Sequence, residues 1–436
     1  MNQILCIALA LLAGLLSSRL MKFLHLPNVT GYLISGIVFG PYVLGQYIGG
    51  WTVDPTSPTT ISSISWISDV ALGFIAFTIG CSFKLSSLKA VGKRVIIITI
   101  AEALGGALIT LGGLFIAYIF LKDTLPVSVI LTLGAIACAT APAATLLVIK
   151  QYKARGPVVD TLIPVVAFDD AVALIAFAVL FSLAKSLASP DIGISPMEIL
   201  VVPLLEIVIS LGLGAALGFL VSFGCRFFKS RANRMIMVIT SILIIVGLTI
   251  LANTLHWKMF DVDFTFSPLL GCMMIGAIFI NFRNDAQLTL ERIDQFTPPL
   301  YMLFFVISGA SLNITIFASE NGYLIAIVAA VYIVMRCVGK WSGAFVSAKV
   351  TKAEPSVQKY LGFTLFPQAG VAIGLATSAS QTFISIGAVQ EGQFVLAIIL
   401  TSTLIYELFG PVITKIALQK AGDIPTKKKV SEEKVS

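Results

Sequence analysis

The chain has 436 residues, of which 57% are hydrophobic and only 12% are charged. Because a soluble domain carries about a quarter charged residues, this composition excludes an ordinary soluble protein and indicates a chain that spans a membrane. The formal net charge of +7 raises the question of a nucleic-acid partner, but the placement of the basic residues explains the charge without one.

Thirteen apolar segments are long enough to be membrane-spanning helices, which need about 20 residues each. We therefore predict an all-α polytopic membrane protein with about 13 transmembrane helices. The segments cover residues 3–22, 28–46, 61–81, 95–120, 126–149, 158–186, 199–225, 235–255, 265–282, 298–317, 321–348, 358–382 and 391–418. The polar stretch 282–296 predicts a short interfacial helix, and residues 421–436 predict a disordered basic tail.

The basic residues test this count. If the N-terminus lies outside and the helices alternate, 24 of the 29 Lys and Arg residues fall on the inside, three fall outside and two lie within a span. Cytoplasmic loops carry an excess of Lys and Arg, so this bias supports thirteen spans. We expect a multi-pass protein of the inner (plasma) membrane with a cytoplasmic C-terminus, and no nucleic-acid partner.

Two of the predicted helices are interrupted by a proline among small residues. CATAPAAT (138–145) surrounds Pro142 in the fifth helix, and TLFPQAGVAIG (364–374) contains Pro367 and Gln368 in the twelfth. The two helices are seven apart in order, so they run in opposite directions and predict inverted five-helix repeats with two broken crossing helices. Paired breaks of this kind point to a transporter's ion site. The alternative is an ordinary proline kink in each helix.

Few charged residues lie deep within the predicted spans, and ionisable groups in such places are functional candidates. They are Glu102, Asp169, Asp170, Glu206, Arg336, Lys340 and Glu407. At 1.5 Å per residue, Glu102, Asp169 and Lys340 each lie about 12–20 Å from a helix end, near the middle of the membrane. Glu206 lies close to the outer end of its helix, where it can reach water.

Asp169 and Asp170 are adjacent, so on a helix their side chains point about 100° apart and cannot both face one partner. We expect one to face the broken helices and the other to face Arg336 and Lys340, which share a helix face because they are four residues apart. A carboxylate that binds either H⁺ or Na⁺, beside a lysine that releases a proton, makes a competitive exchanger.

Structural roles are the alternative for several of these residues. Asp169 can serve to pair helices, and Arg336 can form a buried ion pair with Glu102 or Glu407, which are then supporting carboxylates. The chain has no P-loop, no G-x-G-x-x-G after a strand and no H-E-x-x-H. We therefore expect neither an enzyme nor an ATP-driven pump, and no cofactor other than the transported ions.

Seven stretches, in order along nearly the whole chain, together resemble bacterial monovalent cation:proton antiporters of the second branch of that superfamily. They are LPNVTGYLISGIVFGPYVLG (26–45), GFIAFTIGCSF (73–83), TAPAATLLVIKQYKARGP (140–157), VVAFDDAVAL (165–174), RCVGKWSGA (336–344), FPQAGVAIGLA (366–376) and YELFGP (406–411).

The resemblance implies a homodimer in the lipid bilayer, in which a six-helix core moves against a dimerisation domain by an elevator-type motion. The implied divisions are dimer-domain helices in 1–93, core helices in 94–190, a linking helix in 191–231, dimer-domain helices in 232–319, core helices in 320–420 and the tail in 421–436.

The resemblance also implies roles for individual residues. Asp170 corresponds to the aspartate that binds the ion and carries the proton, and Asp169 to an aspartate that pairs with a lysine. Lys340 is our choice for that lysine, with Arg336 as the alternative one turn away. The break from Thr140 to Thr145 is expected to supply hydroxyl and backbone ligands.

The expected function is exchange of Na⁺ (or Li⁺) for H⁺. Because the pair is Asp-Asp, the resemblance implies two protons per sodium and an electrogenic exchange. One alternative is a K⁺/H⁺ antiporter or K⁺ efflux system on the same scaffold. Kef-type potassium-efflux relatives usually have Gln-Asp at the pair and a nucleotide-binding domain after the last helix, unlike this chain. A further alternative, from another class, is an uncoupled cation channel or sensor.

Overall fold

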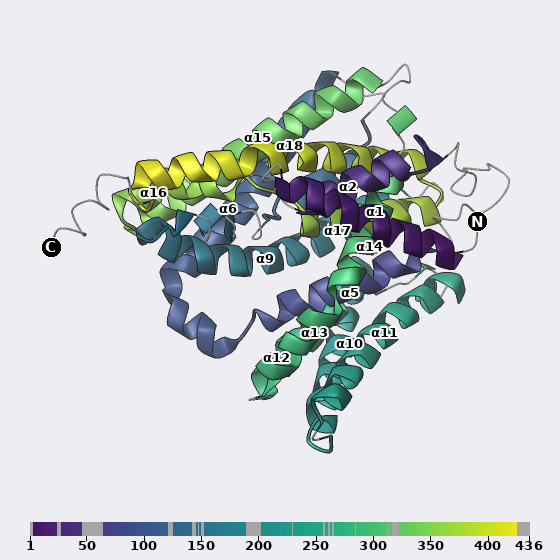
Figure 1. Ribbon diagram of the computed structural model, residues 1–436. Helices are drawn as coiled ribbons and strands as arrows, with labels where there is room; N and C mark the ends of the chain where they lie inside the picture. The colour runs from purple at the N-terminus through teal and green to yellow at the C-terminus, as the bar shows by residue number, and fades with distance from the viewer. Residues whose placement is uncertain are drawn as a thin grey trace. The chain divides into compact units, whose positions relative to one another are not determined.

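The computed structural model of the chain is almost entirely α-helical (Figure 1). The residues that it describes are 3–23, 28–45, 64–120, 125–141, 145–146, 148–149, 152–188, 202–228, 230–255, 258–259, 262–263, 266–283, 285–312, 314–315 and 322–424. Within these ranges the only strands are β1 (Lys258–Met259) and β2 (Val262–Asp263), which form a short antiparallel hairpin. The predicted all-α polytopic fold is confirmed.

Each of the thirteen predicted spans contains an apolar helix. Seven helices are long and apolar enough to cross a membrane: α1 (Gln3–Phe23), α6 (Leu85–Phe120), α9 (Pro157–Ala188), α10 (Val202–Gly224), α11 (Arg231–Leu255), α15 (Gly322–Val350) and α18 (Val389–Ala421). An eighth candidate is a pair bent by 44°, in which α16 (Pro355–Tyr360) and the 3₁₀ helix η3 (Leu361–Leu365) precede α17 (Gly370–Ser385).

The other five apolar helices are shorter than a full span. They are α2 (Asn28–Phe39), α5 (Trp66–Cys81), α7 (Val127–Ile136), α12 (Pro268–Phe282) and α14 (Pro298–Ala310). The predicted continuous segments 28–46 and 126–149 are therefore too long as helices, because α2 ends at Phe39 and α7 ends at the first break. A further helix, α13 (Ala286–Phe296), lies where the sequence predicted a short helix.

The chain divides into two compact units. Unit 1 comprises Met1–Leu88, Ala178–Ile316 and Gln381–Val389, and unit 2 comprises Lys89–Phe177, Phe317–Ser380 and Gln390–Ser436. Both α6 and α9 run from one unit into the other. In α6 the change falls close to Gly92, whose φ of +80° and ψ of 156° interrupt the helix. Only glycine adopts this backbone conformation readily.

Unit 1 is held together by apolar helix packing. Helix α12 packs against α5 and α10, and α14 packs against α1, α2 and α5. One buried cluster joins three of these helices, with members from α1, from α5 and the residues just before it, and from α14. It comprises Cys6, Ala10, Ile64, Ile67, Leu303, Val306, Ile307 and Ala310.

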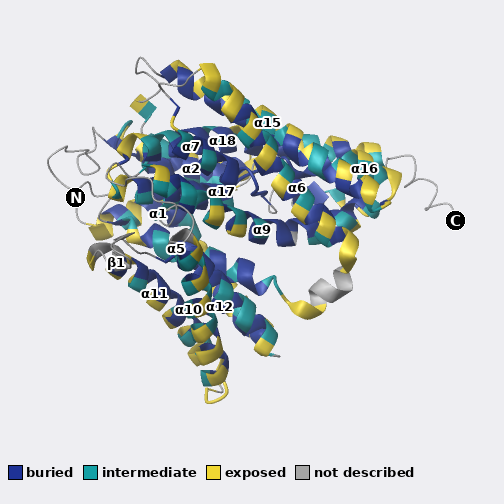
Figure 2. Ribbon diagram, turned by 180° about the vertical axis from the view of Figure 1, so that it is seen from behind, coloured by how far each residue is buried: buried dark blue, intermediate teal, exposed yellow. Residues whose placement is uncertain are grey.

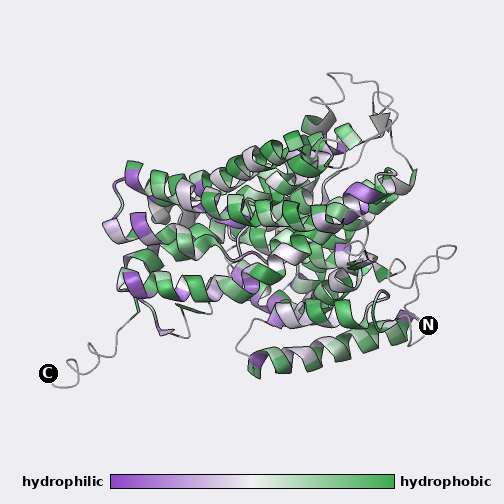
Figure 3. Ribbon diagram, turned by 90° about the horizontal axis from the view of Figure 1, so that it is seen from above, coloured by the Kyte–Doolittle hydropathy of each residue, from purple (hydrophilic) through white to green (hydrophobic). Residues whose placement is uncertain are grey.

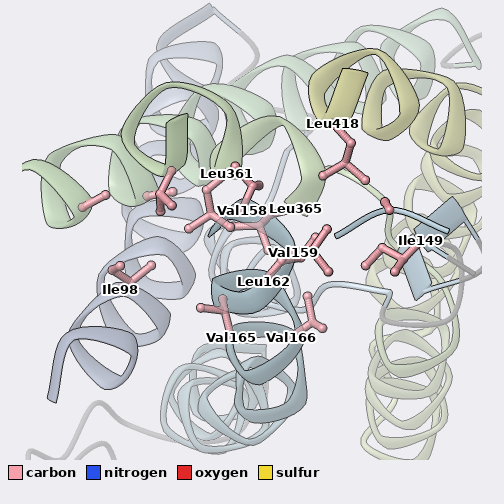
Figure 4. Close-up of a cluster of buried hydrophobic side chains, with 14 of the residues drawn as sticks. Ile98, Ile149, Val158, Val159, Leu162, Val165, Val166, Leu361, Leu365 and Leu418 are labelled. Atoms are coloured by element: carbon pink, nitrogen blue, oxygen red, sulfur yellow. The ribbon is translucent and has the colours of Figure 1, made fainter. Parts of the chain in front are cut away.

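Unit 2 has an apolar cluster around the first half of α9 (Figure 4). On α9 itself the cluster includes Val158, Val159, Leu162, Val165 and Val166, and around them lie Leu361 and Leu365 of η3, Leu418 of α18 and Ile98 of α6. This packing fixes the helical segment that leads directly to Asp169 and Asp170.

The start of α9 is also held by a residue from far along the chain. The Asp423 carboxylate accepts a hydrogen bond of 2.9 Å from the Val159 N–H, and the Asp423 carbonyl accepts one of 2.8 Å from the Arg155 N–H. The first N–H groups of a helix have no partner within the helix, so Asp423, which is only 2% exposed, acts as a cap for α9.

The helix surfaces suit a lipid environment. Exposed residues occur along the length of α10 and α11 (Figure 2), and they include large apolar side chains such as Leu204, Leu220 and Ile236. Figure 3 shows that hydrophobic residues predominate along the helices, whereas hydrophilic ones gather mainly near helix ends. An apolar surface of this extent is stable in hydrocarbon and costly in water.

Candidate functional site

Two helix breaks lie against each other in unit 2. The first follows α7 at residues 137–141, and the second separates η3 from α17 at residues 366–369. The Ala141 N–H donates to the Pro367 carbonyl at 2.8 Å. The predicted breaks are therefore found, and they contact each other. Pro142, which the sequence placed at the centre of the first break, lies outside the described residues.

Thr145 adds a second contact between the breaks. Its hydroxyl donates to the Thr364 carbonyl at 3.1 Å. This bond gives Thr145 a place in joining the two interrupted helices, whereas the sequence suggested it as an ion ligand.

Four consecutive carbonyls at the first break, those of residues 136–139, accept hydrogen bonds from buried side chains. Gln368 Nε2 donates to the first at 3.0 Å. Arg336 donates to the second through Nε at 3.2 Å and to the fourth through Nη2 at 2.6 Å, and Lys340 Nζ donates to the third. Carbonyls freed by the helix break, which the sequence suggested as ion ligands, are thus satisfied by protein donors.

Arg336 also reaches the second break. Its Nη1 donates to the Phe366 carbonyl at 2.7 Å, and its guanidinium lies 4.7 Å from the centre of the Tyr406 ring. The side chain is fully buried. The sequence left open an ion pair of Arg336 with Glu102 or Glu407. In the structure the guanidinium donates to three carbonyls and Glu102 lies against Lys340, so the structure does not support the pair with Glu102. A planar guanidinium suits several carbonyls better than one carboxylate here, since its donors point in fixed, diverging directions.

Lys340 lies between two carboxylates. Its Nζ is 2.8 Å from Glu102 Oε2 and 3.1 Å from Asp169 Oδ2, and all three side chains are 0% exposed. Of the two cations that the sequence offered as partners of Asp169, Lys340 is therefore the one in contact. Burying these charges singly is very costly, and their mutual contact offsets that cost.

The backbones of α6 and α15 touch at this point. A Cβ on Gly339 would lie 2.5 Å from the Gly105 carbonyl oxygen, and a Cβ on Gly343 would lie 2.5 Å from that of Ala101. Small residues that permit such close approach are typical of contacts between membrane helices. The approach brings Glu102 within reach of the Lys340 ammonium.

Asp170 has different surroundings from its neighbour. It is 8% exposed, and its Oδ1 atom is buried without a hydrogen-bond partner among the described residues. The same holds for the hydroxyl of Thr140, which is 2% exposed at the first break. Buried polar atoms are nearly always satisfied, so these two oxygen atoms are candidates for contact with a proton or cation.

Two contributors to the site were not assigned these roles from the sequence. Tyr332 is fully buried, and its hydroxyl donates to Gln368 Oε1 at 3.1 Å. Tyr332, Arg336 and Lys340 follow one another at intervals of four residues, so the sequence could have predicted that all three share one helix face. Gln368 was recognised only as part of the second break. Glu407 is 2% exposed on α18.

Unit 1 holds its described ion pairs nearer to helix ends. Lys185 Nζ is 2.7 Å from Glu206 Oε1, with 18% and 9% of the two side chains exposed. Glu206 was expected to reach toward water, and it lies against this lysine. Arg234 and Arg283 both contact Asp285, just before α13.

The family follows from a match to nearly the whole chain. A family model described as sodium/hydrogen exchanger, transmembrane, matches residues 7–420. The chain belongs to this sodium/hydrogen exchanger family. Membership confirms the predictions of a multi-pass membrane transporter and of a protein that is not an enzyme.

One relative with a described activity is distantly similar to this chain. The Arabidopsis thaliana protein named cation/H(+) antiporter 17 is 26% identical over 377 residues, which are 83% of this chain but only 42% of that protein. The chain thus spans less than half the length of this relative.

Two structures of the sodium proton antiporter MjNhaP1 from Methanocaldococcus jannaschii share the fold. One, at pH 8, has a TM-score of 0.72 and 18% identity, and the other, an electron-microscopy structure, has a TM-score of 0.67 and 17% identity. Both similarities cover 96% of this chain and 98% of the other.

Proposed function

We propose that this exchanger is a secondary active antiporter that moves Na⁺ (or Li⁺) in one direction and H⁺ in the other. The observation that carries the proposal is the pair of adjacent buried aspartates in different surroundings. Asp169 is held by Lys340, whereas Asp170 has a buried oxygen without a hydrogen-bond partner among the described residues. An acid inside a membrane is costly to keep charged, so it holds a proton or a cation.

The exchange is a competition at Asp170. With a proton bound, the carboxyl is neutral and tolerates its apolar surroundings. A sodium ion replaces that proton by binding the ionised carboxylate, with the Thr140 hydroxyl as a second oxygen ligand. Because one group serves both ions in turn, movement of one across the membrane is coupled to movement of the other.

The number of protons per sodium depends on Lys340. If sodium also draws Asp169 away from Lys340, the lysine loses a partner and can release its own proton, which gives two protons per sodium and an electrogenic cycle. The Asp-Asp pair and the contact between Asp169 and Lys340 support this cycle. Glu102 is a second partner of Lys340, and it favours retention of the lysine proton and a one-to-one exchange.

The proposed motion is of the elevator type in a homodimer of the second-branch, Asp-Asp type. Unit 1 serves as the dimerisation domain and unit 2 as the mobile core, since unit 2 contains both breaks and the aspartate pair. We place the protein in the plasma membrane with its N-terminus outside and its C-terminus in the cytoplasm, as the distribution of Lys and Arg favours.

Proton flux in liposomes tests the proposal. Sodium added to vesicles with an imposed pH gradient should collapse that gradient, and Asp170→Asn should abolish the response because an amide has no titratable proton to exchange and no negative charge to balance a cation. Asp160→Asn is the matched control, since it makes the same change at an exposed position of α9 and should leave exchange intact. Full exchange by Asp170→Asn would reject the site.

The cation is tested in the same vesicles with Na⁺, Li⁺ and K⁺ side by side. A response to potassium alone would replace sodium exchange with K⁺/H⁺ exchange on the same scaffold. Uphill accumulation of sodium driven by a pH gradient distinguishes a coupled exchanger from a channel or sensor, which allows only downhill movement.

A further inference from the structure

The satisfied carbonyls at the breaks raise the question of which oxygen atoms are left for the transported ion. Backbone carbonyls in the broken helices of transporters commonly coordinate cations. Here the carbonyls of residues 136–139 and of Phe366 each accept a hydrogen bond from a side chain. Among the described residues, the buried oxygens without a hydrogen-bond partner include Asp170 Oδ1 and the Thr140 hydroxyl, together with the Glu102 carboxylate, which lies against Lys340.

Arg336 donates more of these hydrogen bonds than any other side chain described. It donates to three of the five carbonyls, two in the first break and one in the second. The carbonyl of Ala139, which it holds at 2.6 Å, directly precedes the unpartnered Thr140 in the chain. Arg336 therefore holds the backbone oxygen of the residue that precedes a proposed ion ligand.

The donor geometry makes arginine hard to replace. A guanidinium has five N–H groups in a fixed plane, whereas a lysine ammonium is a single nitrogen on a flexible stem. A lysine at this position keeps the positive charge but cannot reach carbonyls of both breaks from three separate nitrogens. At least one of the carbonyls held by Arg336 is then released.

We propose that Arg336 is a positioning residue that sets cation selectivity, because it withholds the carbonyls of Ala137, Ala139 and Phe366 from the transported ion. This inference rests on the proposed function and extends it. The ion is left with a small set of ligands built from side chains. Potassium-selective sites, in contrast, replace the hydration shell with many backbone carbonyls, so release of carbonyls at the break should favour the larger ion.

The test compares the wild type with Arg336→Lys in liposomes, where KM and kcat are measured separately for Na⁺ and K⁺ at one pH. We expect the ratio of kcat/KM for Na⁺ to that for K⁺ to fall by about tenfold, the scale found when supporting groups around a metal site are removed. The change should lie mainly in KM, since the aspartates that carry the ions are retained.

Ser402→Ala is the matched control. Ser402 is fully buried on α18 and donates to the Ile398 carbonyl at 2.7 Å, so its loss removes a buried hydrogen bond within α18 that involves no carbonyl of either break. This variant should lose some thermal stability and keep the selectivity ratio. If Arg336→Lys is not recovered folded, Arg336→Gln takes its place, with cation-dependent thermal stabilisation in detergent as the measure of selectivity.

The outcomes are distinct. An unchanged ratio in Arg336→Lys, with lower thermal stability only, would show a purely structural arginine and overturn the inference. A wild type without sodium-driven proton flux would instead reject the proposed function. A wild type that exchanges sodium, with a variant shifted toward potassium, supports both.

Discussion

The two units differ in the number of charged residues that they bury. Eight charged residues in the described chain are less than 9% exposed, and seven of them belong to unit 2. They are Glu102, Asp169, Asp170, Arg336, Lys340, Glu407 and Asp423. The eighth, Glu206, lies in unit 1 near the start of α10, against Lys185.

The difference shows where the chain accepts an energetic cost. Unit 1 relies on apolar clusters and close helix contacts, and its described ion pairs involve partly exposed side chains. Unit 2 places two cations and several carboxyl groups where water does not reach. Since a dry apolar interior is usually at least as stable as one with buried ion pairs, the charges in unit 2 other than the cap residue Asp423 need an explanation besides stability, which the proposed ion exchange supplies.

Substitution of Lys340 should cause the largest loss of stability, and it tests whether the buried charges of unit 2 depend on one another. Lys340→Gln leaves Glu102 and Asp169 without their common cation, and breaking such a pair costs about 3–5 kcal/mol. Thermal unfolding in detergent measures the loss. Adding Glu102→Gln removes one uncompensated carboxylate and should recover part of it, whereas strictly additive losses would argue against the pairing. If Lys340 sets the stoichiometry, the charge moved per turnover should also fall.

Asp423 should give an intermediate effect, because it acts through a helix start and not through an ion pair. Asp423→Ala removes the acceptor for the Val159 N–H, and loss of a helix cap costs about 0.5–2 kcal/mol. Asp423→Asn keeps an oxygen acceptor and should be much milder. Unfolding of the two variants side by side separates loss of the cap from loss of charge, and equal destabilisation by both would contradict the cap.

Asp423 should also make the folding stability of the protein depend on pH. Burial raises the pKa of the Asp423 carboxyl, although the Val159 and Val158 N–H groups oppose this, and Asp160 and Glu354 nearby raise it further. A carboxyl whose pKa is higher in the folded state favours folding when protonated, so its contribution declines as pH rises from the unfolded pKa through the folded one. The stability of wild type relative to Asp423→Asn should therefore fall over this window; an increase would contradict the assignment.

Substitution of Glu206 should cause the smallest loss of stability, and it tests whether the ion pair of unit 1 contributes little. Its pair with Lys185 is partly exposed, and pairs of this kind contribute about 0–1 kcal/mol. Glu206→Gln should shift thermal unfolding only slightly and leave exchange intact. A loss as large as that of Lys340→Gln would erase the distinction between the units.

Composition and charge placement predicted much of this fold. Thirteen segments were located because a membrane demands long apolar runs and a biased distribution of Lys and Arg. The breaks were located because proline leaves a mark in a helix. The lengths of α2 and α7 were not predicted correctly, because these apolar segments contain no local sequence signal for the residue at which the helical hydrogen bonds end.

The sequence predicted which residues belong to the candidate site better than it predicted which of them contact each other. The spacing of Arg336 and Lys340 placed both on one face, but their partners depend on how closely α15 approaches α6. That approach requires backbone contact at Gly339 and Gly343, a tertiary feature that one sequence does not specify. The carbonyl acceptors of Arg336 were also hidden, because they exist only where two breaks meet.

The cap on α9 bears on the order in which the chain is assembled. Asp423 and Val159 are 264 residues apart. At a synthesis rate of about 5–20 residues per second, roughly 13–50 s separate the appearance of the two residues. During that interval the first turn of the helix that carries both aspartates lacks this acceptor, and the turn is completed only after the helices between the two residues have been synthesised.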